Sequence, residues 1–375
     1  MPTHALLPTM ATRDATWRYR DRFGDRYGRT FFRRFGPGVV SSIGAGSYRG
    51  EPTPAVDDRH RDALVTALEN GCNVVDTAPD YRCGRAEGVV GDALETADVD
   101  RDAVMLATKG GFVPFDGERP ADPAAYVRER FVETGVVDPA DLARGSHAMT
   151  PAFLDAMLDR SLDALGVDAI DCYYVHNPET QLAARSREDV YDQLTAAFEQ
   201  LEREIAAGRI GRYGVASWEA FRVPPEHDQH LSLPRVLDCA RSAAESVGGD
   251  ANDHGFEAIQ LPFNVHMADA FTSAHHEHPE SGEAVSALEF AHREGLSVVA
   301  SSALMGGDLL DGLPDDIAAE LAGDSPAQRA INFARSAPAV VSALVGMGRP
   351  SHVREDLAAG TFDPLGASAF DAVFE

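Results

Sequence analysis

The feature that most constrains the fold is an alternation that repeats eight times along the chain. Each repeat is a short apolar run, rich in β-branched residues, followed by a polar turn and a helical pattern. The predicted strands are 38–43, 72–76, 103–108, 169–175, 210–216, 256–262, 296–301 and 339–345. Amphipathic segments predict helices near 57–70, 85–97, 151–165, 188–207, 234–246, 282–294, 325–336 and 351–359. Continuous apolar strands that alternate with helices predict an α/β protein with a parallel sheet, and eight units favour a closed (β/α)8 TIM barrel over an open sheet.

Length and connections predict one barrel domain that carries insertions. A chain of 375 residues, 44% of them hydrophobic, can bury a large core, and no repeat or low-complexity linker divides residues 1–375. Residues 1–37 form an N-terminal extension before the first predicted strand. Two long connections, 111–149 and 267–281, are interpreted as loop insertions at the C-terminal face, where such loops often bind ligands or act as lids.

The charge balance limits the classes of partner. Acidic residues number 60 against 33 basic ones, so the formal net charge of −27 disfavours nucleic acid and anionic membranes. A surface this acidic also suits the high-salt cytoplasm of a halophilic organism with an acidic proteome. The first residues lack the pattern of a signal peptide, and no stretch approaches 18 apolar residues, so we expect a cytoplasmic protein. The sequence makes no prediction about oligomeric state.

Polar side chains gather at the ends of three consecutive predicted strands. Asp76 ends the second strand and Tyr81 follows it, Lys109 follows the third strand, and His176 follows the fourth. In a βα-barrel the carboxyl ends of the strands converge on one face, where chemistry takes place. We therefore predict that these four side chains form one catalytic group.

Lys109 is the most informative member of the group because it is the only lysine beside 32 arginines. A guanidinium and an ammonium differ in hydration and in ease of deprotonation, so a single retained lysine indicates a specific task. An ammonium about 4 Å from a phenol, at an effective dielectric of about 20, favours the phenolate by about 4 kcal/mol. That energy predicts a lowered pKa for Tyr81, with Asp76 keeping Lys109 charged and His176 holding a carbonyl oxygen beside Tyr81.

These residues and their surroundings resemble the aldo-keto reductase family. The resemblance runs from SSIGAGSYRG through NVVDTAPDY, LATKGG, DCYYVHNPE, GRIGRYGVASW and EAIQLPFN to VGMGRPSHVREDL. It implies a barrel without metal that uses a nicotinamide cofactor, with NADP(H) preferred and NAD(H) possible, to interconvert an aldehyde or ketone and the corresponding alcohol. It also implies that Tyr81 is the general acid/base, that Lys109 and Asp76 tune it, and that His176 orients the substrate.

The resemblance further implies a cofactor site with several departures from the family pattern. The carboxamide of the cofactor is expected at Ser217 and Gln260, although many members have Ser-Asn where this chain has Ala-Ser. Ser301 stands where many members stack an aromatic ring on the nicotinamide. The adenosine-phosphate loop is expected on Gly346, Gly348, Arg349, Arg354 and Glu355. Its arginines can bind the 2′-phosphate and its acidic residues repel it, so NADP is only preferred over NAD.

Other interpretations of the same residues stay open. A lysine inside a barrel can also attack a carbonyl, so a Schiff-base aldolase acting through Lys109 is one alternative. A non-catalytic nucleotide-binding barrel that serves as a sensor or partner subunit is another. The glycines of GAGSYRG do not match a dinucleotide-binding fingerprint and are interpreted as a strand-end loop. The crowded His275, His276 and His278 are expected in an exposed loop, and no metal site is predicted.

Overall fold

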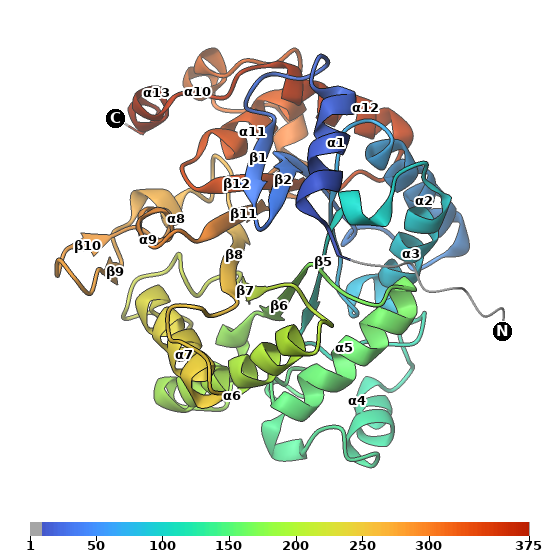
Figure 1. Ribbon diagram of the computed structural model, residues 1–375, viewed down its shortest axis with the longest axis vertical. Coiled ribbons are helices and arrows are strands. Elements are labelled where there is room, and N and C mark those ends of the chain that lie inside the picture. Colours follow the sequence, from blue (N-terminus) through green and yellow to red (C-terminus); the bar gives the residue numbers. More distant parts are fainter. Residues whose placement is uncertain (1–9, 375) are drawn as a thin grey trace.

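Eight parallel strands close into a barrel in the computed structural model, which describes residues 10–374 (Figure 1). The order around the barrel is β11, β12, β3, β4, β5, β6, β7, β8, so neighbours in sequence are neighbours in space. The strands are β3 (Ile43–Gly46), β4 (Val74–Asp76), β5 (Met105–Gly110), β6 (Cys172–His176), β7 (Tyr213–Ala216), β8 (Phe256–Pro262), β11 (Ser297–Ser301) and β12 (Val340–Val345). The predicted (β/α)8 barrel is confirmed.

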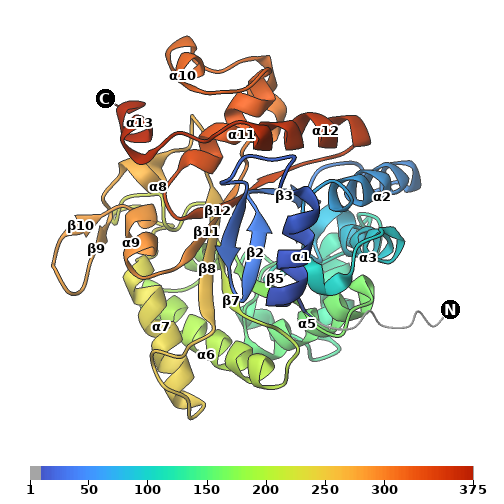
Figure 2. The same ribbon diagram turned by 45° about the horizontal axis from the view of Figure 1, so that its top comes forward.

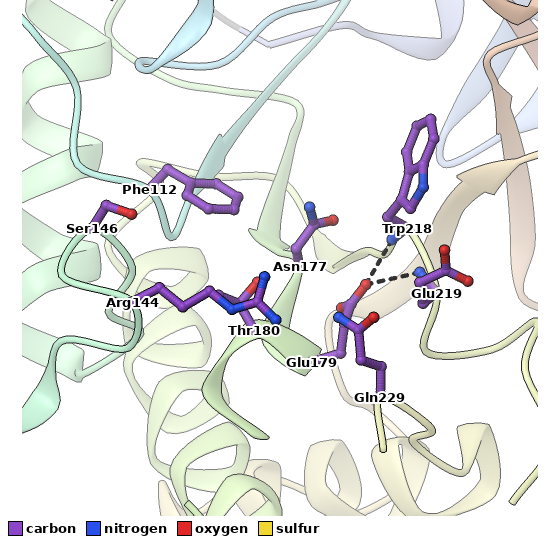
Figure 3. Close-up of a pocket in the computed structure, with 9 residues that line it drawn as sticks. All are labelled: Phe112, Arg144, Ser146, Asn177, Glu179, Thr180, Trp218, Glu219 and Gln229. Carbon is purple, nitrogen blue, oxygen red and sulfur yellow. Dashed lines mark hydrogen bonds between the residues drawn. The ribbon is translucent and has the colours of Figure 1, made fainter. Parts of the chain in front are cut away.

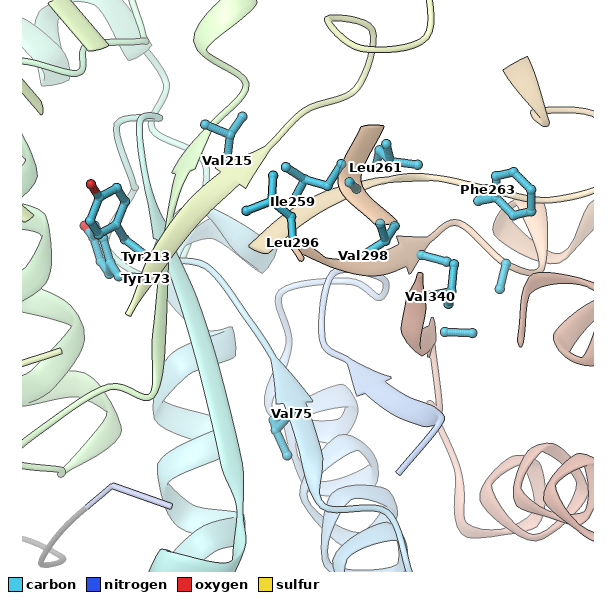
Figure 4. Packing of buried hydrophobic residues seen from close by; sticks show 14 of the residues in the cluster. Val75, Tyr173, Tyr213, Val215, Ile259, Leu261, Phe263, Leu296, Val298 and Val340 are labelled. Atoms are coloured by element: carbon cyan, nitrogen blue, oxygen red, sulfur yellow. The ribbon is translucent and has the colours of Figure 1, made fainter. Parts of the chain in front are cut away.

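Helices surround this barrel and cover the outer faces of its strands (Figures 1 and 2). The main ones are α2 (Pro54–Leu68), α3 (Ala86–Thr96), α5 (Pro151–Leu165), α6 (Arg187–Ala206), α7 (Leu233–Ser246), α9 (Ala287–Arg293), α11 (Pro326–Ser336) and α12 (Pro350–Ala358). Two of them begin as their sequences predict, because the hydroxyls of Thr150 and Ser325 cap the first turns of α5 and α11. Between helices and strands lies one continuous apolar cluster, part of which is drawn in Figure 4.

The amino-terminal end of the barrel is closed by a hairpin that follows α1 (Arg13–Phe23). Strand β1 (Phe32–Phe35) pairs antiparallel with β2 (Gly38–Ser41), and the side chains of Phe35 and Val40 pack against residues at the starts of the barrel strands. The prediction that 38–43 is the first barrel strand is therefore wrong. Its first four residues belong to this hairpin, and the barrel strand begins at Ile43, after Ser42. The main chain of the hairpin end is bonded to a side chain, because Asn73 Oδ1 accepts the Ser41 N–H at 2.7 Å and Asn73 Nδ2 donates to the Val39 carbonyl.

The connection 111–149 is folded rather than open. It contains α4 (Pro123–Val127), the π-helical turn η3 (Arg128–Val132) and the 3-10 turn η4 (Pro139–Asp141). Val127, Phe131 and Val137 pack with Phe153 of α5 in a small core of their own. This insertion therefore packs as a fixed part of the barrel rim.

The second connection, 267–281, differs from its prediction. It holds α8 (Asp269–Thr272) and β9 (His276–Glu277), which pairs with β10 (Ala284–Val285). His276 and His278 are buried, so the expectation of an exposed histidine loop is wrong for these two residues. His276 is buried because its ring bonds the Phe221 carbonyl and stacks on His230, and both partners lie in the distant connection that follows β7. Within residues 10–374 no group of three metal-ligating side chains gathers there or elsewhere.

Short helices complete the fold. They are η1 (Tyr81–Gly84), η2 (Arg101–Ala103), η5 (Pro178–Ala183), η6 (Met305–Asp311), α10 (Asp315–Glu320), η7 (Ala359–Thr361) and α13 (Ala367–Ala372). Among the described helices, none combines the length and the apolar character that a membrane span requires.

Candidate active site

A buried ion pair joins the ends of two neighbouring barrel strands. Lys109 on β5 donates from Nζ to Asp76 Oδ1 on β4 at 2.5 Å and to the Thr77 carbonyl at 2.8 Å. The other Asp76 oxygen accepts from Gln260 Nε2 on β8 at 2.8 Å. Lys109 is 0% exposed and Asp76 is 4% exposed. Because both charged side chains are buried, the pair depends on these hydrogen bonds for its stability.

Tyr81 lies directly beside this pair. The Lys109 ammonium nitrogen is 4.9 Å from the centre of the Tyr81 ring. Tyr81 begins η1, and the next two residues, Arg82 and Cys83, have left-handed backbones with φ of 52° and 57°. Non-glycine residues seldom adopt this conformation, so contacts from elsewhere must hold the turn.

Two contacts hold the turn that follows Tyr81. The Arg82 guanidinium bonds the carboxylate of Asp57 on α2, which Arg85 also binds. The Gly117 N–H, from the 111–149 insertion, donates to the Cys83 carbonyl at 2.7 Å. The sequence gives no signal for these partners, since neither lies at a strand end. The turn, and with it Tyr81, is thus fixed from two sides.

His176, at the end of β6, also packs against Tyr81. The two ring centres are 5.9 Å apart in an edge-to-face arrangement, and the side chain of His176 is 12% exposed. Its Nδ1 lies 3.6 Å from Asp80 Oδ1, and Phe112 packs edge-on against its ring at 5.0 Å. The four predicted side chains therefore meet at one place, joined by Asp80 and Phe112, which the sequence pattern did not single out.

The electrostatics around Tyr81 differ from the prediction. Burial raises the pKa of Tyr81 well above its usual range, and the nearby charges of Asp76 and Asp80 raise it further. The expected shift of this pKa towards neutrality is wrong, because burial disfavours the phenolate and the charge of Asp76, whose Oδ1 lies 2.5 Å from Lys109 Nζ, disfavours it further. Tyr81 is accordingly a neutral phenol across the physiological range and keeps a proton that it can donate.

A cavity of about 310 Å³ opens near the end of β6 (Figure 3). None of the four predicted catalytic side chains lines it, but Phe112, which packs on His176, and Asn177, the next residue in the chain, do. Phe112 and Arg144 approach it from the 111–149 insertion, and Trp218, which is 47% exposed, stands on the side that follows β7. Its other lining residues are Ser146, Asn177, Glu179, Thr180, Glu219 and Gln229. Most of these side chains end in hydrogen-bonding groups, and the two aromatic ones offer ring surface.

The two residues expected at the cofactor carboxamide are engaged inside the protein. Ser217 donates to Glu179 Oε1 at 3.1 Å, and Gln260 donates to Asp76 as described above. Both are 5% exposed. Ser301, at the position expected for an aromatic platform, ends β11 and is half-buried. Gln260 therefore donates a hydrogen bond to the Asp76 carboxylate of the ion pair, whether or not it also contacts a ligand.

The expected phosphate loop lies between β12 and α12 and is open. Gly346 is exposed, and no atom lies within 4 Å of the place where a Cβ would stand on it. The first turn of α12 has no side-chain cap, and Arg349 and Arg354 are exposed without an ion-pair partner among the described residues. Free helix N–H groups beside unpaired guanidinium groups fit a phosphate-bearing ligand. Gly348 and the exposed Glu355 complete the loop.

Comparison with known proteins places this geometry in context. Residues 42–225 match the model of the aldo/keto reductase family. Over 167 residues the chain is 31% identical to a D-threo-aldose 1-dehydrogenase of a Pseudomonas species, a match that covers 43% of this chain and 44% of that protein. The match thus spans less than half the length of this curated relative.

Two solved structures share the fold over most of their length. The holo form of an aldo-keto reductase from Bacillus halodurans superposes with a TM-score of 0.61 at 19% identity, covering 92% of this chain and 95% of that one. An aldo/keto reductase from Klebsiella pneumoniae, solved in complex with NADP and acetate, gives a TM-score of 0.57 at 22% identity, covering 92% and 94%. At these identities the likeness shows the common barrel.

Proposed function

Because this chain belongs to the aldo/keto reductase family, we propose that it is an NAD(P)H-dependent oxidoreductase that interconverts an aldehyde or ketone and the corresponding alcohol. The observation that carries the proposal is the convergence of Asp76, Tyr81, Lys109 and His176 at the carboxyl ends of β4, β5 and β6. A cation, a phenol and an imidazole in one buried place suit the protonation of a carbonyl oxygen.

Tyr81 is the proton donor in this proposal. The high pKa of Tyr81 keeps the phenol protonated in the resting site, so the proton is available when an oxygen becomes strongly basic. The nicotinamide, when bound, supplies the hydride that turns the carbonyl carbon into an alcohol carbon. Tyr81 then gives its proton to the oxygen, and the Lys109 ammonium, 4.9 Å from the ring centre, stabilises the phenolate that remains. His176 holds the carbonyl oxygen beside Tyr81 by a hydrogen bond.

The residues that would hold the cofactor lie on the same face of the barrel. Arg349 and Arg354, with the main chain of Gly346 and Gly348, would bind the adenosine-phosphate end, and Ser217 and Gln260 would face the carboxamide. The unpaired guanidinium groups and the NADP bound to the Klebsiella pneumoniae protein favour NADP(H), with NAD(H) possible.

The cavity lined by Phe112 and Asn177 indicates the class of substrate. Burying its polar lining against an apolar molecule would leave many donors and acceptors without partners, which costs free energy for each group. A small carbonyl compound that carries hydroxyl groups would satisfy them and could rest its carbon skeleton on Phe112 and Trp218. The relative named for aldose oxidation is consistent with this class.

The aldolase alternative requires a Lys109 that is uncharged and accessible. A Schiff base needs an uncharged amine that can approach a carbonyl carbon. Here the nitrogen is held by Asp76 and the Thr77 carbonyl, and the side chain is fully buried. Borohydride added with substrate would label Lys109 in an aldolase and leave it unlabelled in a reductase.

Turnover tests the proposal directly. NADPH and NADH would each be followed with a panel of small aldehydes and ketones, from molar salt downward, because the net charge of −27 suits a cytoplasm rich in salt. We expect cofactor oxidation with hydroxylated aldehydes and faster turnover with NADPH. Tight binding of either cofactor without turnover of any member of the panel would favour a sensor or partner subunit instead.

A further inference from the structure

A second histidine, His147, contacts the main chain of His176. It lies at the end of the 111–149 insertion and is 0% exposed. Its Nε2 is 2.7 Å from the His176 carbonyl oxygen, and its Nδ1 is 2.9 Å from Gln181 Nε2. A carbonyl only accepts and an amide nitrogen only donates, so Nε2 carries the proton and Nδ1 does not.

The surroundings keep His147 in this one form. Burial lowers the pKa of His147 to about 4, so the ring stays neutral throughout the physiological range. Gln181, itself fully buried, also donates to the His147 carbonyl at 2.9 Å. The edge of the Phe112 ring packs on His147 at 4.9 Å, and the same ring packs on His176. His147 is thus fixed through its main chain, both ring nitrogens and its ring face.

The peptide that His147 holds is a strained one. Asn177, which follows His176, has a left-handed backbone with φ of 46°. Its N–H donates to the Ala216 carbonyl at 2.6 Å, so the peptide between residues 176 and 177 is bonded at both its oxygen and its nitrogen. Fixing this peptide fixes the direction in which the His176 side chain leaves the strand. Losing the bond to its oxygen would let the turn relax and rotate the imidazole away from Tyr81.

Glycine makes the close approach possible. A Cβ on Gly111 would stand 2.6 Å from the His176 carbonyl oxygen and 3.0 Å from His147 Nε2. The end of β5, the end of β6 and the returning insertion therefore meet around one carbonyl oxygen, with space only for hydrogen at residue 111.

We propose that His147 is a positioning residue for His176, and that the 111–149 insertion serves as a fixed brace of the active site through it. The kinetic test of this inference rests on the proposed function, because it measures turnover. The structural test, which observes His176 directly, does not. The inference predicts that removing the ring nitrogens disturbs His176 while leaving cofactor binding intact.

The experiment compares three variants with the wild-type protein. His147→Phe keeps a ring and removes both hydrogen bonds, whereas His147→Gln keeps an N–H within reach of the His176 carbonyl. His276→Phe is the matched control, because His276 is also buried, also has a pKa lowered to about 4, and also bonds a main-chain carbonyl, that of Phe221. We would measure kcat, KM, the Kd for NADPH and the Tm of each.

We expect His147→Phe to lose at least tenfold in kcat with an unchanged Kd for NADPH, and His147→Gln to recover most of that loss. His276→Phe should lower the Tm by a similar amount and retain its kcat per folded molecule. Equal kcat for the two Phe variants, or no recovery with Gln, would overturn the inference. If His147→Phe does not fold, Gln181→Leu replaces it. A kcat for Gln181→Leu equal to that of His276→Phe would then overturn the inference.

A second readout separates this inference from the proposed function. Nitrogen-15 NMR of the histidine rings reports the tautomer of His147 and the environment of His176 without turnover. If the protein reduces no carbonyl at all, the proposed function fails, yet shifted His176 signals in His147→Phe alone would still support the brace. Unchanged His176 signals in that variant would reject the brace whatever the activity.

Discussion

Two arcs of the barrel mouth are built on opposite principles. The first, for which we propose a catalytic role and which we call the catalytic arc, is formed by Asp76, Tyr81, Lys109 and His176. Its ion pair is buried and hydrogen-bonded to neighbouring groups. The second, which we propose binds the cofactor phosphate and call the phosphate arc, runs from Gly346 to Asp356. It presents exposed arginines without ion-pair partners in the described part of the chain and a helix start without a side-chain cap. The difference between the two arcs is the one that the proposed division of tasks requires. Groups that move a proton must be preorganised, whereas groups that bind and release a charged ligand must have free donors.

The largest effect is expected in the catalytic arc, from Tyr81→Phe. Removing one hydroxyl removes the proton donor, and general acid catalysis contributes about 10² to 10⁴-fold to a rate. We expect kcat to fall by that factor, with an unchanged Kd for NADPH measured by fluorescence titration. A Tyr81→Phe protein with wild-type turnover would remove Tyr81 from the mechanism.

The second effect concerns the ion pair. Lys109→Met leaves the Asp76 carboxylate buried and unpaired, which typically costs about 3–5 kcal/mol of folding free energy. The double variant Asp76→Asn, Lys109→Met should regain much of that stability without regaining activity. Chemical denaturation of both variants checks this expectation. Equal stability of the single and double variants would mean that the two charges are not coupled.

The phosphate arc contains a buried carboxyl group with a raised pKa, Asp356, and a second such group, Glu87 on α3, bonds Thr108 next to the catalytic arc, so the two allow a matched test. Burial raises the pKa of Glu87, which accepts from Thr108 next to Lys109, to about 7, and that of Asp356 on α12 also to about 7. Because each folded-state pKa lies above the unfolded value, the stability is fully present below about pH 4 and is lost as pH rises through 7.

Glu87→Gln and Asp356→Asn should each remove part of this pH dependence. Both amides mimic the protonated acid, so each variant should exceed the wild-type free energy of unfolding at pH 8, by up to about 3 kcal/mol, and match it near pH 4. Only Asp356→Asn, in the phosphate arc, should also tighten NADPH binding at pH 8. Denaturation and cofactor titration at several pH values check both expectations. If the two variants changed NADPH affinity equally, the proposed difference between the arcs would be wrong.

The smallest effect is expected from the arginines of the phosphate arc. Arg354→Ala and Arg349→Ala each remove one charge-assisted contact, which is worth about 1.5–3 kcal/mol. We expect the Kd for NADPH to rise about tenfold or more, the Kd for NADH to change little, and kcat at saturating cofactor to stay constant. Parallel loss of affinity for both cofactors would show that these residues do not contact the 2′-phosphate.

The sequence predicted the features that follow from local pattern. Strand ends locate Asp76, Lys109 and His176 on one rim, because parallel strands of a barrel present their carboxyl ends together. The features it missed depend on contacts between distant segments. Examples are the bond between His147 and the His176 carbonyl and the burial of His276.

Two other differences have the same origin. The β1–β2 hairpin and the first barrel strand are separated by one serine, so a single apolar run, 38–43, hides two elements. The direction of the shift in the Tyr81 pKa depends first on the burial of the phenol and then on the nearby charges of Asp76 and Asp80, and spacing along the chain determines none of these.

The central claim is that this site protonates a carbonyl that has received a hydride. NADPH deuterated at the transferred position of its nicotinamide, reacted with an accepted aldehyde, tests it most directly by mass spectrometry of the product. We predict one deuterium on the alcohol carbon with the wild-type protein, formed 10² to 10⁴-fold more slowly with Tyr81→Phe. A product without deuterium, or equal rates for the two proteins, would contradict the account.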